Sequence, residues 1–330
     1  MVLPPTLLSG DLVAIVSPSS GLAGRHLARL SAGRRALERM GFRTKLMPHT
    51  AASSTHAATI RDRVTDLEQA FADDEVSGVL CAIGGRGASQ LLNELDYDLI
   101  RSHPKVFCGY SDATALHAAI GRETGLVTFY GPSVLMEFGD HPRPFAETES
   151  GFLRSVASGQ PVGEVPALPD IVVEGTDWDN PHERRREPAP KSRLIRDGRG
   201  RGPMVGGCLP VLTSLMGTPW QVETDHRLLI LDTPQLPYSI SVALENLWQL
   251  RNAGALQHLS GLVVAWPFAL DQLDDLEAAL LNAVPKDTDY PVLLGRPFGH
   301  TSPFMTLPLG VDAILDGTYF SVEQPATKGP

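Results

Sequence analysis

Cysteine is scarce in this sequence, and its scarcity narrows the class of protein that the chain can encode. The 330 residues include three cysteines, Cys81, Cys108 and Cys208, each in or beside an apolar run. A disulfide-stabilised secreted scaffold or a cysteine-rich zinc site needs more cysteines in closer clusters. We therefore expect buried thiols in a reducing compartment and no metal site built from them.

Basic residues are in the minority, and long apolar runs are missing. Lys and Arg total 28 against 38 Asp and Glu, a net charge of −10, so no general attraction to nucleic acid or to an anionic membrane is expected. No stretch approaches the roughly 18 apolar residues of a membrane span. The N-terminus also lacks the basic start and small-residue cleavage site of a secretory signal. These features predict a cytoplasmic protein with neither nucleic acid nor membrane as a partner.

Alternating strand and helix patterns dominate the first part of the chain. Apolar strands are expected at 12–16, 42–47 and 78–83, and an amphipathic helix at 60–72. Such alternation predicts an α/β fold whose parallel sheet is Rossmann-like or flavodoxin-like, with ligands at the carboxyl ends of the strands. We assign residues 1–138 to this N-terminal domain.

The pattern changes after residue 138. Between 139 and 203 prolines recur and periodicity fades, which predicts a linker with a basic insertion loop. Strand and helix patterns return in residues 204–330 and predict a smaller, β-rich α/β domain at the C-terminus. At this length and 42% apolar content, two domains can each bury a core. The active site is expected between them.

Two strand-to-turn junctions carry the residues best suited to chemistry. Glycines in Gly84-Gly85-Arg86-Gly87 allow positive φ and bring backbone N–H groups close to an anionic ligand. The second junction, Gly109-Tyr110-Ser111-Asp112-Ala113, has the form of a nucleophile elbow, with Ala113 in place of the last glycine. The alternative is that Ser111 only caps a helix, with Asp112 in its first turn.

A basic run stands out on this acidic chain. Between Glu183 and Arg201 there are eight Lys or Arg and three acids, a local charge of +5. The run is either a solvated or mobile loop, or a loop that recognises an anionic part of a substrate, with Trp178 available to stack on a ring.

Taken in order, the motifs resemble the LD-carboxypeptidase family of serine peptidases, which includes murein tetrapeptide carboxypeptidases and the self-immunity peptidases that inactivate microcin C. The resemblance runs nearly end to end, and the insertion at Trp178-Asp179 is more similar to the microcin-immunity branch. Its carriers are Val16-Ser17-Pro18-Ser19, Gly84-Gly85-Arg86-Gly87, residues 105–112 and 124–132, Gly206-Gly207, residues 212–219, Gly299-His300-Thr301 and residues 307–311.

The resemblance implies roles for particular residues. Ser111 matches the nucleophile and His300 the general base, although a lone histidine in a Gly-flanked loop could be structural. The N–H groups of Gly85 and Asp112 match the oxyanion donors. A serine hydroxyl attacks well only when an imidazole takes its proton, and the oxyanion needs fixed donors.

Further expectations concern the substrate and the assembly. The residues expected to contact substrate are Arg86, Trp178 and Tyr110. The resemblance also implies a small peptide-like substrate, no cofactor, no metal and a homodimer.

The acidic member of the triad departs from the family pattern. The family places a glutamate, usually in a Glu-Asp pair, where the segment 228–234 has the single acid Asp232. Either Asp232 replaces the glutamate with a side chain one methylene shorter, or a residue is lost and Asp232 descends from the following aspartate. We expect Asp232 to orient the imidazole. In addition, Cys208 stands where asparagine is common, and Ala265-Trp266 where Gly-Arg is expected.

The sequence therefore predicts a cofactor-independent serine hydrolase that cleaves an amide bond through an acyl-enzyme. Its substrate would be a muropeptide or a peptidyl- or aminoacyl-nucleotide-type molecule. One alternative is an acyltransferase or natural-product tailoring enzyme on the same fold. Another is a catalytically degenerate binding protein that keeps the pocket.

Overall fold

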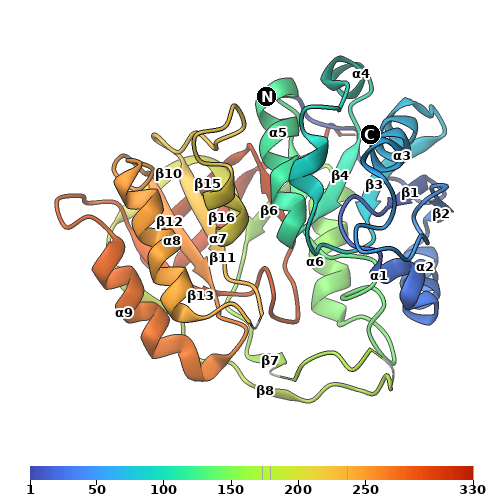
Figure 1. The fold of residues 1–330 in the computed structure, drawn as a ribbon. Coiled ribbons are helices and arrows are strands. Elements are labelled where there is room, and N and C mark those ends of the chain that lie inside the picture. Colours follow the sequence, from blue (N-terminus) through green and yellow to red (C-terminus); the bar gives the residue numbers. More distant parts are fainter. Residues whose placement is uncertain (173, 179, 236, 330) are drawn as a thin grey trace.

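Each half of the molecule is built around its own β-sheet, and the two halves form lobes that lie side by side (Figure 1). The computed structural model describes residues 1–172, 174–178, 180–235 and 237–329. The predicted two-domain α/β architecture, with a parallel N-terminal sheet, is confirmed. None of the helices within those ranges has the length and apolarity that a membrane span requires.

The N-terminal lobe contains a six-stranded sheet in which five strands are parallel. Those five have the strand order 2-1-3-4-5 of the flavodoxin-like fold. The sixth strand comes from near the other end of the chain and is antiparallel to its neighbour. From edge to edge the strands are β14 (Leu307–Leu309), β5 (Thr128–Tyr130), β4 (Val106–Gly109), β3 (Val76–Cys81), β1 (Leu12–Val16) and β2 (Arg43–Leu46).

Helices cover both faces of this sheet because alternate side chains of each strand point to opposite sides. In β1, Val13 and Ile15 belong to the core that includes α2 and α6, whereas Ala14 and Val16 belong to the core that includes α3, α4 and α5. The helices are α1 (Leu22–Arg25), α2 (Leu27–Arg39), α3 (Ile60–Ala72), α4 (Tyr97–Ser102), α5 (Thr114–Thr124) and α6 (Ala146–Val156). The bounds of α3 equal those predicted, since Thr59 caps its first turn by accepting a hydrogen bond from the Asp62 N–H.

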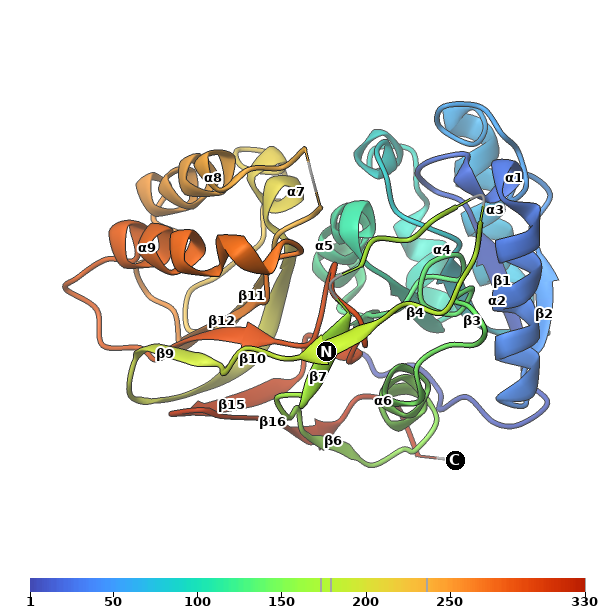
Figure 2. The same ribbon diagram turned by 90° about the horizontal axis from the view of Figure 1, so that it is seen from below.

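The C-terminal lobe contains an eight-stranded mixed sheet, with helices over one face (Figure 2). From edge to edge its strands are β6 (Pro161–Glu164), β16 (Tyr319–Pro325), β15 (Asp312–Asp316), β10 (Arg199–Cys208), β11 (Leu228–Asp232), β12 (Gly261–Ala265), β13 (Val292–Arg296) and β9 (Arg193–Arg196). The helices are α7 (Leu209–Ser214), α8 (Ile240–Asn252) and α9 (Leu273–Ala283).

One hydrophobic core is continuous between the lobes. Ile230 and Val263 of the C-terminal sheet belong to the same buried cluster as Val13 and Ile15 of the N-terminal sheet. Helix α5, which follows the nucleophile elbow, contacts β10 and α7 of the other lobe. The lobes are therefore packed against each other rather than joined by a flexible tether.

The prediction of a linker at 139–203 is wrong, because this segment forms a regular helix and strands. This segment forms α6, β6 and β9, together with the two-stranded sheet of β7 (Asp170–Val172) and β8 (Arg186–Pro188). Strands β6 and β9 are the outer strands of the C-terminal sheet. Edge strands tolerate proline and charged side chains, so they lack the apolar pattern that marks a buried strand.

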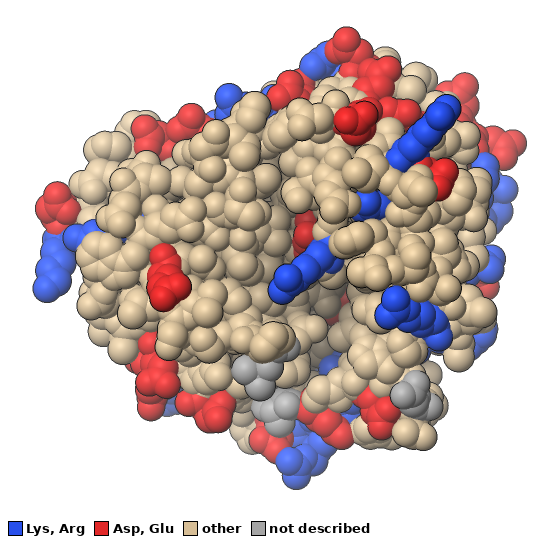
Figure 3. All heavy atoms as spheres, in the orientation of Figure 1, with Lys and Arg blue, Asp and Glu red and all other residues tan. Residues whose placement is uncertain are grey.

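The basic run forms strands β8 and β9 and the start of β10, and it is not an open cationic patch, because six of its seven arginines are paired with acids. On the face drawn in Figure 3, basic and acidic side chains lie interspersed, mostly toward the edges, with uncharged residues between them. Six arginines of the run form ion pairs: Arg184 with Asp140, Arg185 with Glu187, Arg186 with Glu147, Arg193 with Asp274 and Glu277, Arg199 with Asp316, and Arg201 with Asp312. The predicted buried thiols are confirmed, since all three cysteines are free and buried.

Replacing Arg184 with Gln is expected to destabilise the protein strongly. The side chains of Arg184 and Asp140 are only 8% and 2% exposed, and Nη2 lies 2.7 Å from a carboxylate oxygen. Losing the cation leaves the Asp140 charge buried without its partner, which costs about 3 kcal/mol of the free energy of unfolding in urea. The matched control is Arg185→Gln, whose pair is 76% and 39% exposed and contributes less than about 1 kcal/mol. Equal losses in the two variants would show that burial of the Arg184 pair has no bearing on its contribution.

Candidate active site

Ser111 lies on a strained turn at the carboxyl end of β4. Its φ is +60°, an uncommon value for a residue with a side chain. A 3₁₀ turn, Ser111–Ala113, leads directly into α5. The neighbouring glycine-rich turn comes so close that a Cβ on Gly84 would lie 2.8 Å from the Ser111 Cβ. The backbone thus has the form predicted for a nucleophile elbow, and the helix-cap interpretation alone does not account for its strain.

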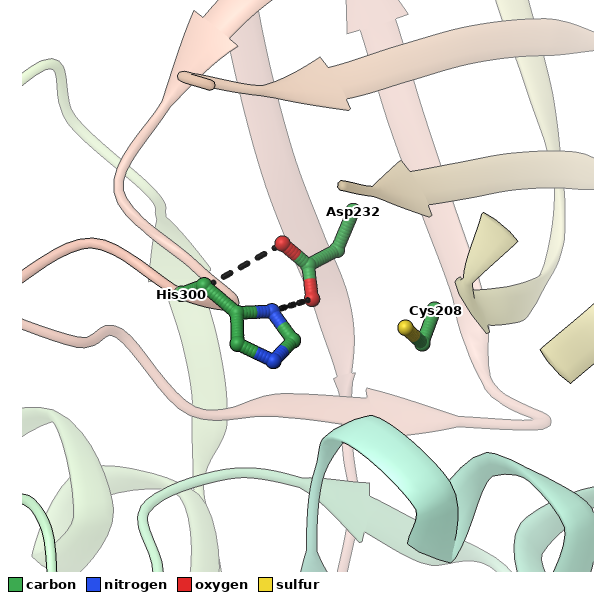
Figure 4. Close-up of side chains that lie close together, drawn as sticks. All are labelled: Cys208, Asp232 and His300. Carbon is green, nitrogen blue, oxygen red and sulfur yellow. Dashed lines mark hydrogen bonds and ion pairs between the residues drawn. The ribbon is translucent and has the colours of Figure 1, made fainter. Parts of the chain in front are cut away.

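The structure brings His300 and Asp232 to this serine. His300 Nε2 lies 3.2 Å from Ser111 Oγ, and His300 Nδ1 lies 2.7 Å from Asp232 Oδ2. The backbone N–H of His300 donates to the other carboxylate oxygen over 3.1 Å, so two bonds hold the histidine on the acid (Figure 4). Because Nδ1 faces a carboxylate, the proton belongs there, which leaves Nε2 as the acceptor facing the hydroxyl.

Gly299 lets the histidine loop approach the short acidic side chain. Its φ is +84°, and a Cβ built on it would lie 2.0 Å from Asp232 Oδ1. The carboxylate is fully buried at the end of β11. The aspartate is one methylene shorter than a glutamate. It reaches the imidazole because the glycine lets the backbone of the His300 loop lie close to the carboxylate.

Tyr130 is a site residue that was not predicted from the sequence. Its hydroxyl donates to Asp232 Oδ2 over 2.7 Å and accepts from the Ser111 N–H over 3.3 Å. Burial and the nearby Asp232 raise the pKa of Tyr130 well above its usual value, so the phenol remains a donor. The signals in the sequence were its place at the carboxyl end of a strand beside β4 and within residues 124–132, one of the segments that carry the family resemblance. Tyr130 connects the nucleophile turn in one lobe with the acid in the other.

The two predicted oxyanion donors lie on adjoining turns. Ser20 holds the Gly84 carbonyl through its N–H at 3.3 Å and its hydroxyl at 2.9 Å. Because a trans peptide places C=O and N–H on opposite sides, the Gly85 N–H points away from Ser20. The buried Asp112 carboxylate accepts from the Ala88 N–H over 2.8 Å, which ties the glycine-rich turn to the elbow. Whether these N–H groups bind an oxyanion remains a prediction.

Of the three predicted substrate contacts, Tyr110 has to be corrected. Its side chain is buried, its hydroxyl donates to the buried Glu137 over 2.9 Å, and its ring lies edge-on to His300 with centroids 5.0 Å apart. Tyr110 therefore supports the imidazole from behind and does not offer its hydroxyl to a substrate. Arg86, in contrast, is exposed on the glycine-rich turn.

Trp178 lies against the N-terminal lobe. Its ring centroid is 4.7 Å from that of His26, and the Arg29 guanidinium carbon lies 5.3 Å from the ring centroid. The ring is partly buried by these contacts. Asp179, which was part of the same motif, is outside the described residues. A contact between Trp178 and substrate remains a prediction.

Cys208 is the third side chain around the acid (Figure 4). Its sulfur, a carboxylate oxygen of Asp232 and a ring nitrogen of His300 lie within 4.8 Å of one another, a donor set of the kind that zinc accepts. However, the imidazole and the carboxylate are bonded to each other, and burial raises the thiol pKa well above its usual value. A metal bound here would have to displace the proton of the Cys208 thiol and the proton on His300 Nδ1. We therefore assign no metal to this group of side chains.

Comparisons with known proteins find matches among the LD-carboxypeptidases and their microcin-immunity relatives. The family model for the LD-carboxypeptidase N-terminal domain matches residues 13–131, and that for the C-terminal domain matches residues 201–315. A probable murein peptide carboxypeptidase of Bacillus subtilis (strain 168) is 32% identical over 323 residues, covering 95% of this chain and 91% of the relative. The microcin C7 self-immunity protein MccF of Escherichia coli is 28% identical, with 96% and 93% coverage. The solved structure of MccF in complex with glutamyl sulfamoyl guanosine superposes with a TM-score of 0.92 at 25% identity, covering 99% of this chain and all of that one.

Replacing Tyr130 with Phe is expected to slow the reaction of Ser111 by about 10- to 100-fold, since one hydrogen bond to a buried charge contributes about 1.5 to 3 kcal/mol. The measurement is the rate at which a fluorophosphonate labels Ser111, followed across pH. The change should leave the fold intact and weaken the hold on Asp232.

The matched control is Tyr110→Phe. It removes an equally buried phenol that is bonded to Glu137 instead of Asp232. A similar slowing in both variants would show that the Tyr130 hydrogen bond to Asp232 has no specific part in the reaction.

Proposed function

The chain belongs to the LD-carboxypeptidase family, and we propose that it is a serine amide hydrolase in which Ser111, His300 and Asp232 form the catalytic triad. The observation that carries the proposal is a continuous chain of two hydrogen bonds. The first joins the Ser111 hydroxyl to His300 Nε2 over 3.2 Å, and the second joins His300 Nδ1 to Asp232 over 2.7 Å. Side chains from segments far apart in the sequence meet in the order that acyl transfer needs.

The proposed reaction proceeds through an acyl-enzyme. Ser111 Oγ attacks the amide carbonyl while His300 Nε2 takes the hydroxyl proton, and Asp232 stabilises the resulting imidazolium. The N–H groups of Gly85 and Asp112 stabilise the oxyanion. The imidazolium then gives its proton to the departing amine. Water, deprotonated by His300, finally cleaves the ester and restores the serine.

The proposed substrate is small, peptide-like and carboxylate-bearing. Relatives bear the names murein peptide carboxypeptidase and microcin self-immunity protein, and one solved relative holds glutamyl sulfamoyl guanosine. In this chain Arg86 is exposed beside Gly85 and has no ion-pair partner among the residues that the structure describes. We propose that it binds a carboxylate next to the cleaved bond. Six arginines of the basic run are already paired, which argues against that run as a phosphate-binding surface.

Other expectations remain predictions. These are a homodimer, a cytoplasmic location and the absence of a cofactor. An acyltransferase would use the same acyl-enzyme but pass it to an amine, so analysis of products formed with added amines separates it from a hydrolase. A degenerate binding protein would bind substrate tightly without fluorophosphonate labelling, and the alignment of Ser111 with His300 favours the enzyme over it.

Replacing Ser111 with Ala is expected to lower turnover by about 10⁴-fold or more, because no other group takes over the nucleophile. The assay follows release of the terminal amino acid from a murein tetrapeptide and, separately, cleavage of an aminoacyl sulfamoyl adenosine. Ser31→Ala, an exposed serine on α2, should leave both rates unchanged. Equal turnover by the wild type and Ser111→Ala would remove Ser111 from the mechanism.

Replacing Asp232 with Glu tests whether the site is built for the shorter acid. Oδ1 already occupies the space beside Gly299, so the extra methylene must displace the His300 loop. A shift of about 1 Å in a reacting group costs about 100-fold in rate. We expect fluorophosphonate labelling of Ser111 to slow by that factor. A rate equal to or above the wild type would show that the site accepts the family's glutamate.

A further inference from the structure

Arg63 on α3 is a buried cation with no part in the catalytic steps described above. Only 2% of the residue is exposed. It forms no ion pair with any residue inside the described ranges. Burying a charge without such a pair costs on the order of several kcal/mol unless its donors find other partners. An arginine kept at that cost is expected to make contacts that a neutral side chain cannot replace.

The guanidinium joins two turns of the N-terminal lobe. Its Nη1 donates to the Pro18 carbonyl over 2.6 Å and to the Gly87 carbonyl over 3.0 Å, and its Nη2 donates to Gln90 Oε1 over 2.7 Å. Pro18 belongs to the segment that follows β1, and Gly87 to the glycine-rich turn that follows β3. Gly87 can approach this closely because it has no side chain: a Cβ on it would lie 3.1 Å from Nη1.

The first proposed oxyanion donor, the Gly85 N–H, lies between these contacts. The segment after β1 carries Ser20, whose N–H and hydroxyl hold the Gly84 carbonyl. That carbonyl shares a planar peptide with the Gly85 N–H, so its position fixes the direction of the donor. Arg63 therefore constrains the donor from both sides, through the Ser20 segment and through Gly87.

The same cation reaches the second proposed donor, the Asp112 N–H, through one peptide group. The Gly87 carbonyl accepts from Arg63, and the N–H of that peptide, on Ala88, donates to the Asp112 carboxylate over 2.8 Å. The peptide dipole thus has a cation at its carbonyl end and an anion at its N–H end, which is the favourable direction. Burial lowers the pKa of Arg63, and the Asp112 charge offsets part of that effect.

We propose that Arg63 is a positioning residue for the oxyanion site, holding the Gly85 and Asp112 N–H groups where the tetrahedral intermediate requires them. The proposal rests on the proposed function, since an oxyanion forms only if Ser111 attacks a carbonyl. Donors of this kind are effective because they already point at the oxygen when its charge develops. Arg63 is buried and acts through the two turns, so its loss slows the covalent step and leaves binding unchanged.

Fluorophosphonate labelling of Ser111 over a range of probe concentrations separates these two effects. Attack on phosphorus also develops negative charge on an oxygen, so it needs the same donors. In Arg63→Met, which removes the charge and the donors at similar length, the rate at saturating probe should fall about 100-fold. The half-saturating probe concentration should stay that of the wild type.

The matched control is Arg29→Met. Arg29 is 5% exposed, and it too donates to backbone carbonyls, those of Leu135 and Met136. Neither carbonyl belongs to the two turns, so this variant should lose stability, seen as a lower melting temperature, and still label like the wild type. A wild-type saturated rate in Arg63→Met, or equal slowing in both variants, would overturn the proposal.

Arg63→Lys takes the place of Arg63→Met if the latter does not fold. A single ammonium group does not reproduce the planar fork that spans both carbonyls and Gln90, so a slowing of about tenfold is expected. A wild-type rate in this variant would equally contradict the proposal.

Amide hydrogen exchange tests the placement of the turn whether or not Ser111 is a nucleophile. In the Arg63 variant, exchange within residues 84–88, where the Ala88 N–H is bonded to Asp112, should be about tenfold faster than in the wild type. Arg29→Met should leave this segment unchanged. Unaltered exchange in the Arg63 variant would sink the proposal. Failure of the wild type to label at Ser111 would instead overturn the proposed function, and exchange would still decide whether Arg63 holds the turn.

Discussion

The hydrogen bond between Ser111 and His300 requires the two lobes to be held in a fixed relative position, because its two ends belong to different lobes. An error of about 1 Å in their relative placement would remove most of the benefit of alignment. The continuous core that includes Ile15 and Ile230 supplies the needed rigidity, since close-packed interiors do not deform gradually. Helix α5 adds a second connection, because the Thr114 hydroxyl accepts from the Cys208 N–H across the lobe boundary over 3.0 Å.

The buried carboxylate of Asp232 is the electrostatic centre of this arrangement. An isolated charge at such depth would be strongly unfavourable, yet it accepts hydrogen bonds from the His300 backbone, the His300 ring and Tyr130. Each donor comes from a part of the site that must be in place before acyl transfer. The acid therefore positions the histidine, and it also connects the turn that carries the nucleophile with the loop that carries the base.

Much of this could be predicted from the sequence, and the exceptions have identifiable causes. Helix α3 and the turn at Ser111 were predicted because local patterns determine them: a capped amphipathic repeat in one, glycine and serine after a strand in the other. Tyr130 was missed because its partner Asp232 is more than 100 residues away, and its sequence context is that of a buried strand. Tyr110 was misassigned because neighbouring residues on an extended turn point to opposite sides. The strands in 139–203 were missed because outer strands lack a continuous apolar pattern.

Strand β14 has a consequence for how the protein is made. Residues 307–309 complete the N-terminal sheet by pairing with β5, whose own residues are 128–130. During synthesis, the outer edge of β5 stays open until residues 307–309 have left the ribosome. Unpaired edges invite association with other chains. Maturation of the first lobe thus waits for a strand from the second half of the chain, and products truncated before residue 307 would be prone to aggregate.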